Sequence, residues 1–224
     1  SLARKGGIQL GLLYYNDNQP EKALAAYKQV ISNYPGSEEA KVALQDLKSV
    51  YIDLNDINAY ANYVNSIGGN IRLEVGEQDS LTYIAAEKLF MRGDNEGARR
   101  SLAGYLQTFP EGAFSSNANF YLGSIAFAKK EFDEAIQRFK SVIASNDTKF
   151  LEESVARTAE IEYLGKDYPA ALESFKRLQI VAESPENKQA ARLGIMRCAL
   201  QTGQQKDALL AADELLKEPK PSPE

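Results

Sequence analysis

The sequence predicts an all-α fold built from about six stacked helical hairpins. Two observations predict it. Apolar residues recur at helical spacing along most of the chain, and alanines stand at equivalent places in successive hairpins: Ala98, Ala135, Ala171 and Ala208 are separated by 37, 36 and 37 residues. Ala23 precedes Ala98 by 75 residues, which leaves room for one further unit. Self-similarity at such a period indicates stacked supersecondary units, each of which buries its apolar face against its neighbours.

The clearest hairpin spans residues 118–145. Apolar side chains recur at helical spacing on both sides of a polar break at residues 129–131. Gly123 and Ala135 are small residues that we expect to face each other across the hairpin, because ridges and grooves must approach closely where helices pack. Phe132 and Phe139 complete the pattern of the second helix.

The first hairpin spans residues 2–37. Asn18 is expected to cap its second helix, with Pro20 in the first helical turn, and Ser37 is expected to cap the helix that follows. In the second hairpin, Asp56 is the expected cap of the second helix. Tyr60 stands where the pattern has alanine, and overpacking a close contact costs about 1–3 kcal/mol, so we expect these two helices to splay.

Residues 70–76 alternate apolar and polar, with Ile71, Leu73 and Val75 on one side. This segment is either an edge to which a partner adds a strand or an extended connector. We favour the connector, because a lone strand is not stable by itself. The resulting division is two repeats in 1–69, a connector and bend in 70–78, four repeats in 79–217, and an extended tail in 218–224.

The remaining hairpins follow in order. The third is expected to open at Asp79 or Ser80 and to turn at Gly93, and the fourth spans 112–146. The fifth spans 148–184 and the sixth 185–216, and three prolines in the last residues favour an extended tail. The chain begins without Met inside a helical pattern, so we expect it to be a piece of a longer protein.

Composition excludes several function classes. No stretch approaches the roughly 18 apolar residues that a membrane span needs. The net charge of −5 disfavours nucleic acid as a partner. Histidine is absent, which removes the commonest general base and the commonest metal ligand. We therefore expect no enzymatic activity and no cofactor, and we expect the single cysteine, Cys198, to be a buried structural thiol.

The repeated residues resemble those of a known family. Leu10-Gly11, Tyr14, Ala23 and Tyr27 repeat the pattern of residues 122–139, and Pro35 closes the unit. This pattern resembles the tetratricopeptide repeat (TPR) family across nearly the whole chain, although the usual Trp is absent and the period is longer than the usual one. The resemblance implies a right-handed superhelix whose concave face binds proteins or peptides.

The resemblance also implies which residues line the concave groove, namely positions two, five, nine and twelve of each first helix. In repeats five and six these are Glu153, Ala156, Glu160, Tyr163, Ala190, Leu193, Arg197 and Leu200. The predicted partner-binding residues are Tyr83, Glu87, Phe90, Phe120, Phe127, Glu160 and Tyr163. Their aromatic rings would form a ladder, unless some of them pack between repeats as core. An acidic, aromatic groove favours a neutral or basic segment of a partner protein.

Residues 121–123, 132–135 and 34–37 look most like the envelope TPR proteins of Gram-negative bacteria, such as the periplasmic Tol-Pal partner and the lipoprotein that assists outer-membrane assembly. The resemblance implies a non-catalytic interaction scaffold in the periplasm or at the outer membrane of a bacterial cell envelope. Two alternatives remain open. The chain could be a regulatory or targeting segment of a larger protein with an enzymatic domain elsewhere, or a self-assembling repeat module.

Overall fold

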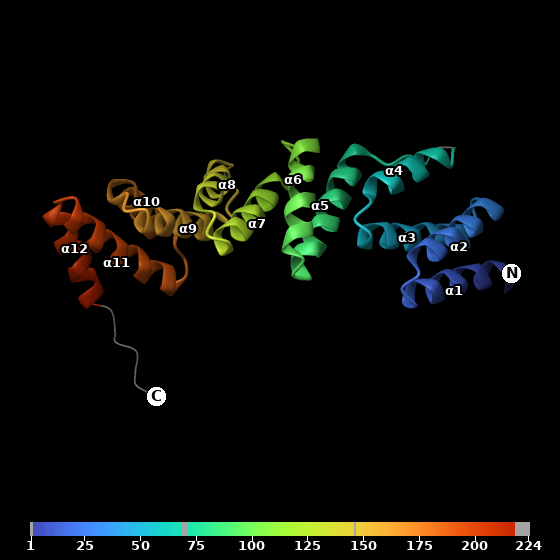
Figure 1. The fold of residues 1–224 in the computed structure, drawn as a ribbon, viewed down its shortest axis with the longest axis horizontal. Coiled ribbons are helices and arrows are strands. Elements are labelled where there is room, and N and C mark those ends of the chain that lie inside the picture. The colour runs from blue at the N-terminus through green and yellow to red at the C-terminus, as the bar shows by residue number, and fades with distance from the viewer. Residues whose placement is uncertain (1, 69–70, 146, 218–224) are drawn as a thin grey trace, which may run out of the picture. The chain divides into compact units, whose positions relative to one another are not determined.

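A computed structural model describes residues 2–68, 71–145 and 147–217 (Figure 1). Within these residues the elements are α1 (Leu2–Asn16), α2 (Pro20–Asn33), α3 (Glu38–Asp53), α4 (Ile57–Ser66), α5 (Val75–Met91), α6 (Asn95–Thr108), α7 (Ser115–Ala128), α8 (Phe132–Ala144), α9 (Leu151–Leu164), α10 (Tyr168–Val181), α11 (Pro185–Gln201) and α12 (Gln205–Leu216). The all-α fold of six helical hairpins is confirmed. The tail predicted for 218–224 lies outside the described residues.

The chain divides into two compact units, residues 1–114 and 115–224. The first contains α1 to α6 and the second contains α7 to α12. The segment expected to separate two repeats from four lies inside the first unit, where α5 packs on α3 and α4. Leu81 and Ala85 of α5 share one apolar core with Tyr27 and Leu47. A bend at 70–78 therefore stays a prediction, and residues 69–70 lie outside the described part of the chain.

Each hairpin turns at one residue with a left-handed backbone. These residues recur with the repeat period: Asn18, Asn55, Gly93, Lys130, Lys166 and Gly203, with φ between 53° and 82°. The prediction that Asn18 caps α2 is wrong, because Asn18 is this turn residue and Gln19 holds the cap position without a side-chain hydrogen bond. Pro20 is the first residue of α2, as expected. Asparagine is common both at helix caps and at left-handed turn positions, so the residue type alone does not distinguish the two roles of Asn18.

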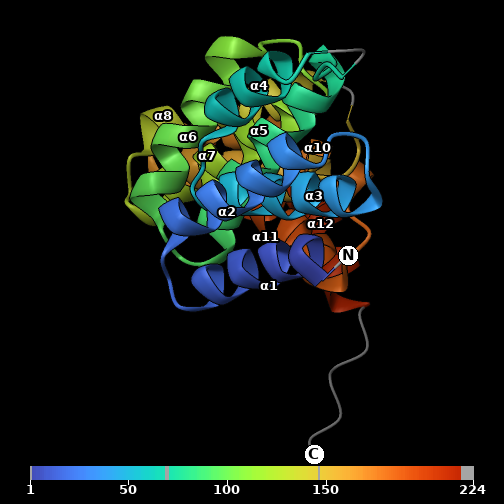
Figure 2. The ribbon, with the colours of Figure 1, turned by 90° about the vertical axis from the view of Figure 1, so that its right-hand side faces the viewer.

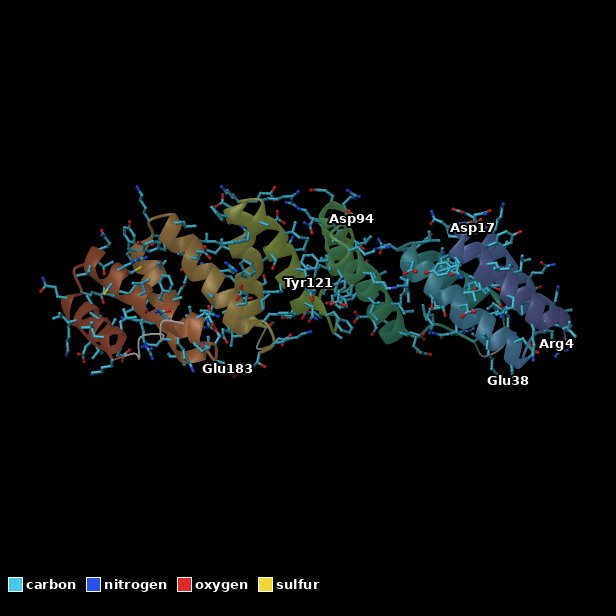
Figure 3. All side chains as sticks on the ribbon, turned by 90° about the horizontal axis from the view of Figure 1, so that it is seen from below. Arg4, Asp17, Glu38, Asp94, Tyr121 and Glu183 are labelled. Carbon is cyan, nitrogen blue, oxygen red and sulfur yellow. The ribbon has the colours of Figure 1, made fainter. Side chains whose placement is uncertain are left out.

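Two predicted caps are confirmed, and a third cap, Asp94, was not predicted. The Ala40 N–H donates to Ser37 Oγ at 3.1 Å, and the Ala59 N–H donates to Asp56 Oδ1 at 3.1 Å. Asp94, labelled at the start of α6 in Figure 3, accepts from the Gly97 N–H at 2.9 Å. Each of these bonds satisfies a backbone donor that the helix itself leaves unpaired.

Small residues bring the helices of a hairpin together. The repeat alanines Ala23, Ala98, Ala135, Ala171 and Ala208 are all buried. The small residues of the first helices meet aromatic rings instead of the alanines. A Cβ added to Gly11 would lie 2.5 Å from the Tyr27 ring, and one added to Gly123 would lie 2.9 Å from the Phe139 ring. Gly123 is therefore covered by Phe139, and the expectation that it faces Ala135 is corrected.

An apolar core of the first unit extends from α1 to α5. It includes Tyr51, Tyr60 and Val64, with Leu73 of the connector packed against it. The two helices α1 and α2 lie side by side, as Figure 2 shows. In contrast, α4 diverges from α3, and these two helices pack together less extensively than the two helices of any other hairpin. The splay expected from Tyr60 is present, because a buried tyrosine occupies the place of an alanine.

The helix α5 begins earlier than predicted. It starts at Val75, with Glu74 as its cap residue, and not at Asp79 or Ser80. Asp79 is buried inside the helix, where its carboxylate accepts from the Tyr105 hydroxyl at 2.5 Å and from the Ala113 N–H at 2.9 Å. This carboxylate therefore ties α5 to α6 and to the segment that follows α6.

Candidate peptide-binding groove

The second unit carries a groove of about 380 Å³ between α9 and α11, with α10 beneath it. Its walls and floor are formed by Glu153, Ala156, Arg157, Glu160, Tyr163, Leu164, Phe175, Leu178, Asn187, Ala190, Leu193, Gly194 and Arg197. Seven of the eight first-helix positions expected in repeats five and six line it, and Leu200 is the exception. The positions that the repeat register assigns to repeats five and six thus lie together around one groove.

The floor of the groove is aromatic and apolar. Phe175 and the buried Leu178 rise from α10. Gly194 lies directly over Phe175, and a Cβ at this position would come within 2.4 Å of the ring. Tyr163 meets Phe175 edge to face, with 6.5 Å between the ring centroids. The absence of a side chain at Gly194 therefore lets α11 lie close to the ring that floors the groove.

The charges that line the groove are balanced. Arg157 Nε lies 2.8 Å from Glu153 Oε1, and Arg157 Nη1 lies 2.9 Å from Glu160 Oε2. Arg197 is exposed on the opposite wall. With two glutamates and two arginines, this groove is not the acidic surface that Glu87, Glu153 and Glu160 led us to expect. Exposed ion pairs of this kind contribute little to stability, so their main effect is to fix where the charges stand.

Glu152 fixes the start of α11 against α9. Its carboxylate accepts from the Glu183 and Ser184 N–H groups at 3.0 and 3.1 Å, and from Ser184 Oγ and Asn187 Nδ2, both at 2.8 Å. The bond from the Glu183 N–H is the largest cause that lowers the pKa of Glu152 to about 2, followed by the bond from Asn187. Figure 3 labels Glu183 beside this junction. The side chain thus holds both walls of the groove in register.

The structure brings together three of the predicted residues in the second unit. Glu160 and Tyr163 line the groove, and Phe127 lies under the Arg157 guanidinium, 4.8 Å from carbon to ring centroid. Phe120 is half-buried and stacks on Phe150 with 4.2 Å between centroids. Phe120 therefore packs largely within its own unit, in agreement with the alternative that some of the predicted aromatic residues pack between repeats as core.

In the first unit, the prediction for Tyr83 is corrected. Its side chain is 2% exposed and stacks on Phe114 with 4.4 Å between centroids, so the expectation of an exposed ring is wrong. Its hydroxyl donates to Glu87 at 2.6 Å. Tyr83 lies on the helix face that packs against the segment after α6, and Phe114 of that segment covers its ring. Phe150, 36 residues after Phe114, covers Phe120 in the same way. Phe90 and Glu87 are half-buried.

Sequence reasoning did not select Arg157 and Phe175 for the groove. Arg157 stands four residues after Glu153 and three before Glu160, a spacing that pairs opposite charges on a helix and so signals an ion-pair cluster. Phe175 occupies the second-helix position that Phe139 fills one repeat earlier. The signal for its role was Gly194, whose missing side chain makes room for a ring.

Profiles of the tetratricopeptide repeat family match residues 8–37 and residues 85–148. Each of these two stretches is therefore similar to tetratricopeptide repeats. A search of curated protein sequences finds no match. Among solved structures, MamA AMB-1 is 13% identical, with 100% of this chain and 99% of that chain covered and a TM-score of 0.53.

Two further solved structures are similar to this chain. PilF of Pseudomonas aeruginosa is 18% identical over 95% of this chain and 90% of that chain, with a TM-score of 0.48. A tetratricopeptide repeat protein from Parabacteroides merdae is 14% identical over 99% of this chain and 82% of that chain, with a TM-score of 0.43. At these identities the likeness concerns the fold alone.

The groove between α9 and α11 offers apolar area, aromatic faces and two guanidinium groups. These are the side chains that anchor peptides at interfaces. Among the described residues, no group of three or more Cys, Asp or Glu side chains could hold a metal ion, and no helix is long and apolar enough to cross a membrane. Cys198 is buried, and burial raises the pKa of its thiol.

Proposed function

We propose that this chain is a non-catalytic scaffold that binds an extended segment of a partner protein in the groove between α9 and α11. The observation that carries this proposal is the coincidence of two independent features. The first-helix positions that the repeat register assigns to a concave face line a groove of about 380 Å³. Ligand sites are typically concave and apolar, with a few polar groups that fix orientation.

The chemistry of the groove specifies the segment. Tyr163, Phe175 and Leu193 provide a surface for one apolar side chain of the partner. Asn187 and Arg197 can donate hydrogen bonds to the carbonyl groups of its backbone. Because Glu153 and Glu160 already pair with Arg157, we propose a neutral segment in preference to a basic one.

Phe127 extends this site toward α7. Its ring lies under Arg157, whose guanidinium also pairs with Glu160, so a partner that contacts Glu160 would reach the edge of Phe127. The other positions chosen from the sequence, Glu87, Phe90 and Phe120, stay proposals for contacts on their own repeats.

A selection from a phage-displayed library of random peptides tests the proposal. We expect selected peptides to be neutral with one large apolar residue. Their affinity, measured by fluorescence anisotropy, should fall about tenfold or more in Tyr163→Ala, because truncating an aromatic anchor in a groove typically costs about 2 kcal/mol.

The matched control is Ile180→Ala, since Ile180 is 83% exposed on α10 and does not line the groove. This variant should bind like the parent chain. The proposal would be contradicted if the selected peptides bound Tyr163→Ala and the parent chain equally well. It would also be contradicted if the library gave no binder at all.

We propose further that the protein acts in a bacterial cell envelope, in the periplasm or at the outer membrane. The support is the resemblance of residues 121–123, 132–135 and 34–37 to envelope proteins of this family. Fractionation of the native cells, followed by immunoblotting, should find the protein with periplasmic or outer-membrane markers. Recovery with cytoplasmic markers would contradict this assignment.

A further inference from the structure

A second cavity lies in the first unit, between the start of α4 and the helices α5 and α6. Its volume is about 220 Å³, and its lining residues all fall within 55–109. It is therefore distinct from the groove between α9 and α11, which belongs to the second unit. The volume lies below the roughly 300–1,000 Å³ of pockets that take drug-sized ligands, so a ligand of this cavity is small.

Gly104 keeps the cavity open on the side of α6. Glycine is a poor helix former, yet Gly104 lies within this helix. A Cβ added to Gly104 would meet no atom within 4 Å, and the backbone of Gly104 is not left-handed. Neither a close helix contact nor a turn therefore requires glycine at this position. The missing side chain instead leaves room in the cavity that Gly104 lines.

In the last two repeats, charged side chains bridge the equivalent junction. The repeat alanines of α6 and α12 are 110 residues apart, so Gly104 corresponds to Glu214. By the same offset, Thr82 of α5 corresponds to Arg192 of α11. Glu214 accepts from Gln179 Nε2 at 2.9 Å and lies 3.6 Å from Arg192 Nε, so it connects α10, α11 and α12. Glycine and threonine, at the same two positions of the earlier junction, are too small to form this bridge.

The cavity is lined mainly by neutral hydrogen-bonding groups, the side chains of Asn55, Asn58, Gln78, Thr82, Ser101 and Thr108. Its one charged lining residue is Asp56, whose Oδ1 is already used to cap α4. By contrast, the cavity between α10 and α12 is lined by charged residues, among which Lys176 pairs with Asp207 at 2.8 Å. A carboxylate without a basic side chain beside it disfavours an anion, so the chemistry of this lining selects a neutral ligand.

The hydroxyl groups of the lining offer acceptors. Thr82 Oγ1 and Thr108 Oγ1 donate to backbone carbonyls at 2.7 and 3.0 Å, which leaves their oxygen lone pairs for a ligand. Ser101 Oγ donates to Asn55 Oδ1 at 2.9 Å, which leaves the amide nitrogen of Asn55 as a donor. A ligand that both donates and accepts hydrogen bonds matches this set.

Two side-chain amides add donors and acceptors together. Within the described residues, no hydrogen bond engages the side chains of Asn58 and Gln78, and each carries two N–H donors and one carbonyl acceptor. The half-buried ring of Phe109 also lines the cavity, with its centroid 5.6 Å from that of the buried Tyr105. Amides and hydroxyls beside an aromatic ring suit a molecule whose edge carries hydroxyl groups and whose face carries C–H groups. A sugar ring has this form.

We propose that the cavity between α4, α5 and α6 binds one neutral sugar unit. Asn58 and Gln78 hydrogen-bond to its hydroxyl groups, and Phe109 packs against its C–H face. A single unit is expected because the cavity is small. The site does not depend on the peptide groove of the second unit, so the two proposals stand or fall separately.

Saturation-transfer difference NMR tests this proposal with four probes, namely glucose, galactose, mannose and N-acetylglucosamine, each at millimolar concentration. At least one sugar should bind the parent chain and shift the backbone amide signals of residues 55–58 and 101–109. Gly104→Gln should abolish this binding, because its side chain would extend into the cavity. The variant should stay folded, since glutamine is a better helix former and its Cβ meets no atom within 4 Å. Asn58→Ala and Gln78→Ala should each weaken binding about two- to tenfold, through the loss of hydrogen bonds.

Ser141→Gln is the matched control. Ser141 holds the position of Gly104 one repeat later, is exposed on α8 and does not line the cavity, so this variant should bind like the parent chain. Circular dichroism checks that all variants keep their helix content. The proposal is overturned if none of the four sugars binds, or if a sugar binds Gly104→Gln as well as the parent chain. Binding of N-acetylglutamine amide in place of the sugars would also overturn it, because the cavity would then recognise a peptide amide.

Discussion

Glu152 connects two repeats through a single side chain, and its titration is measurable. Its folded pKa of about 2 lies below the ordinary value of 4.5, so the carboxylate stabilises the fold above pH 4.5, and this contribution is lost as the pH falls toward 2. We expect Glu152→Gln to lower the melting temperature at neutral pH. The difference from the parent chain should shrink as the pH approaches 2, where Glu152 is protonated.

The matched control for this pH series is Glu183→Gln, which removes an exposed carboxylate at the same junction and leaves the backbone donor in place. Its melting temperature should follow that of the parent chain at every pH. If Glu152→Gln shows the same difference at pH 2 as at pH 7, the hydrogen bonds to its carboxylate are not what holds α11.

A second residue-scale prediction concerns the turn residues. Lys166 adopts φ +62°, a region that costs a side-chain-bearing residue about 1–2 kcal/mol and that glycine enters freely. Lys166→Gly should therefore raise the free energy of unfolding, by up to about 1 kcal/mol after the entropy of glycine is subtracted. Differential scanning calorimetry should show a melting temperature a few degrees higher, roughly 2–4 °C per kcal/mol for this chain length.

The same substitution at a helical lysine should have the opposite sign. Lys188 is exposed within α11, and Lys188→Gly should lower stability by about 1 kcal/mol, the ordinary propensity cost of glycine in a helix. A decrease in both variants would show that the left-handed turn is not strained by lysine.

At the scale of the element, two helical glycines differ in what surrounds them. A Cβ at Gly194 would lie 2.4 Å from the Phe175 ring, whereas one at Gly104 in α6 meets no atom within 4 Å. Gly104→Ala should therefore stabilise the chain by about 0.5–1 kcal/mol, through the higher helix propensity of alanine. Gly194→Ala should destabilise it by about 1–3 kcal/mol through overpacking, and should weaken groove binding because Phe175 must move.

Urea unfolding of the two variants measures both effects. Equal stabilisation by the two alanines would mean that Phe175 yields freely and that Gly194 is not required for the close approach of α11. Binding of a selected peptide, measured in parallel, separates a change in the groove from a change in stability.

The helices and their pairing were accessible from sequence because the apolar stripe and the small repeat residues recur with a fixed period. The start of α5 was not, because Val75 is 72% exposed and Gly76 is a poor helix former, so its first turn carries no apolar stripe. The alternation of Ile71, Leu73 and Val75 therefore indicated an extended segment that ends at residue 76, whereas α5 already begins at Val75.

The candidate site was accessible in part for a similar reason. Register found Glu160 and Tyr163, since these positions depend only on helical period. It did not identify the rings that cover Tyr83 and Phe120, because Phe114 and Phe150 lie just before α7 and α9, outside the helical spacing that defines the groove positions. These two phenylalanines are 36 residues apart, so the covering contact itself recurs with the repeat period.

At the scale of the whole molecule, limited proteolysis tests the bend predicted for 70–78. Residues 71–74 lie between α4 and α5, and the Leu73 N–H donates to Asn65 Oδ1 at 3.3 Å. The segment between α6 and α7 is held more firmly. The Ala113 N–H donates to Asp79, the Phe114 N–H donates to the Tyr105 hydroxyl, and Phe114 stacks on Tyr83. We expect a nonspecific protease to cut first within residues 67–74.

Mass spectrometry of the first fragments locates the cut. A first cut within 109–114, where the two compact units meet in sequence, would contradict the expectation and would place the weakest segment at the division of the units. Asp79→Asn should move cleavage toward 109–114, since the Ala113 and Tyr105 hydrogen bonds would lose a charged acceptor.

The order of contacts in the second unit has a mechanical consequence. Apart from the approach of α9 to α11, the extensive helix contacts among its described residues join neighbours in the sequence. If the chain were pulled from its C-terminus, its hairpins would therefore unfold one after another, beginning with the last. Each hairpin of about 36 residues would release roughly 120 Å of extended chain, so the second unit would lengthen in steps under load and shorten again as each hairpin refolded onto its neighbour.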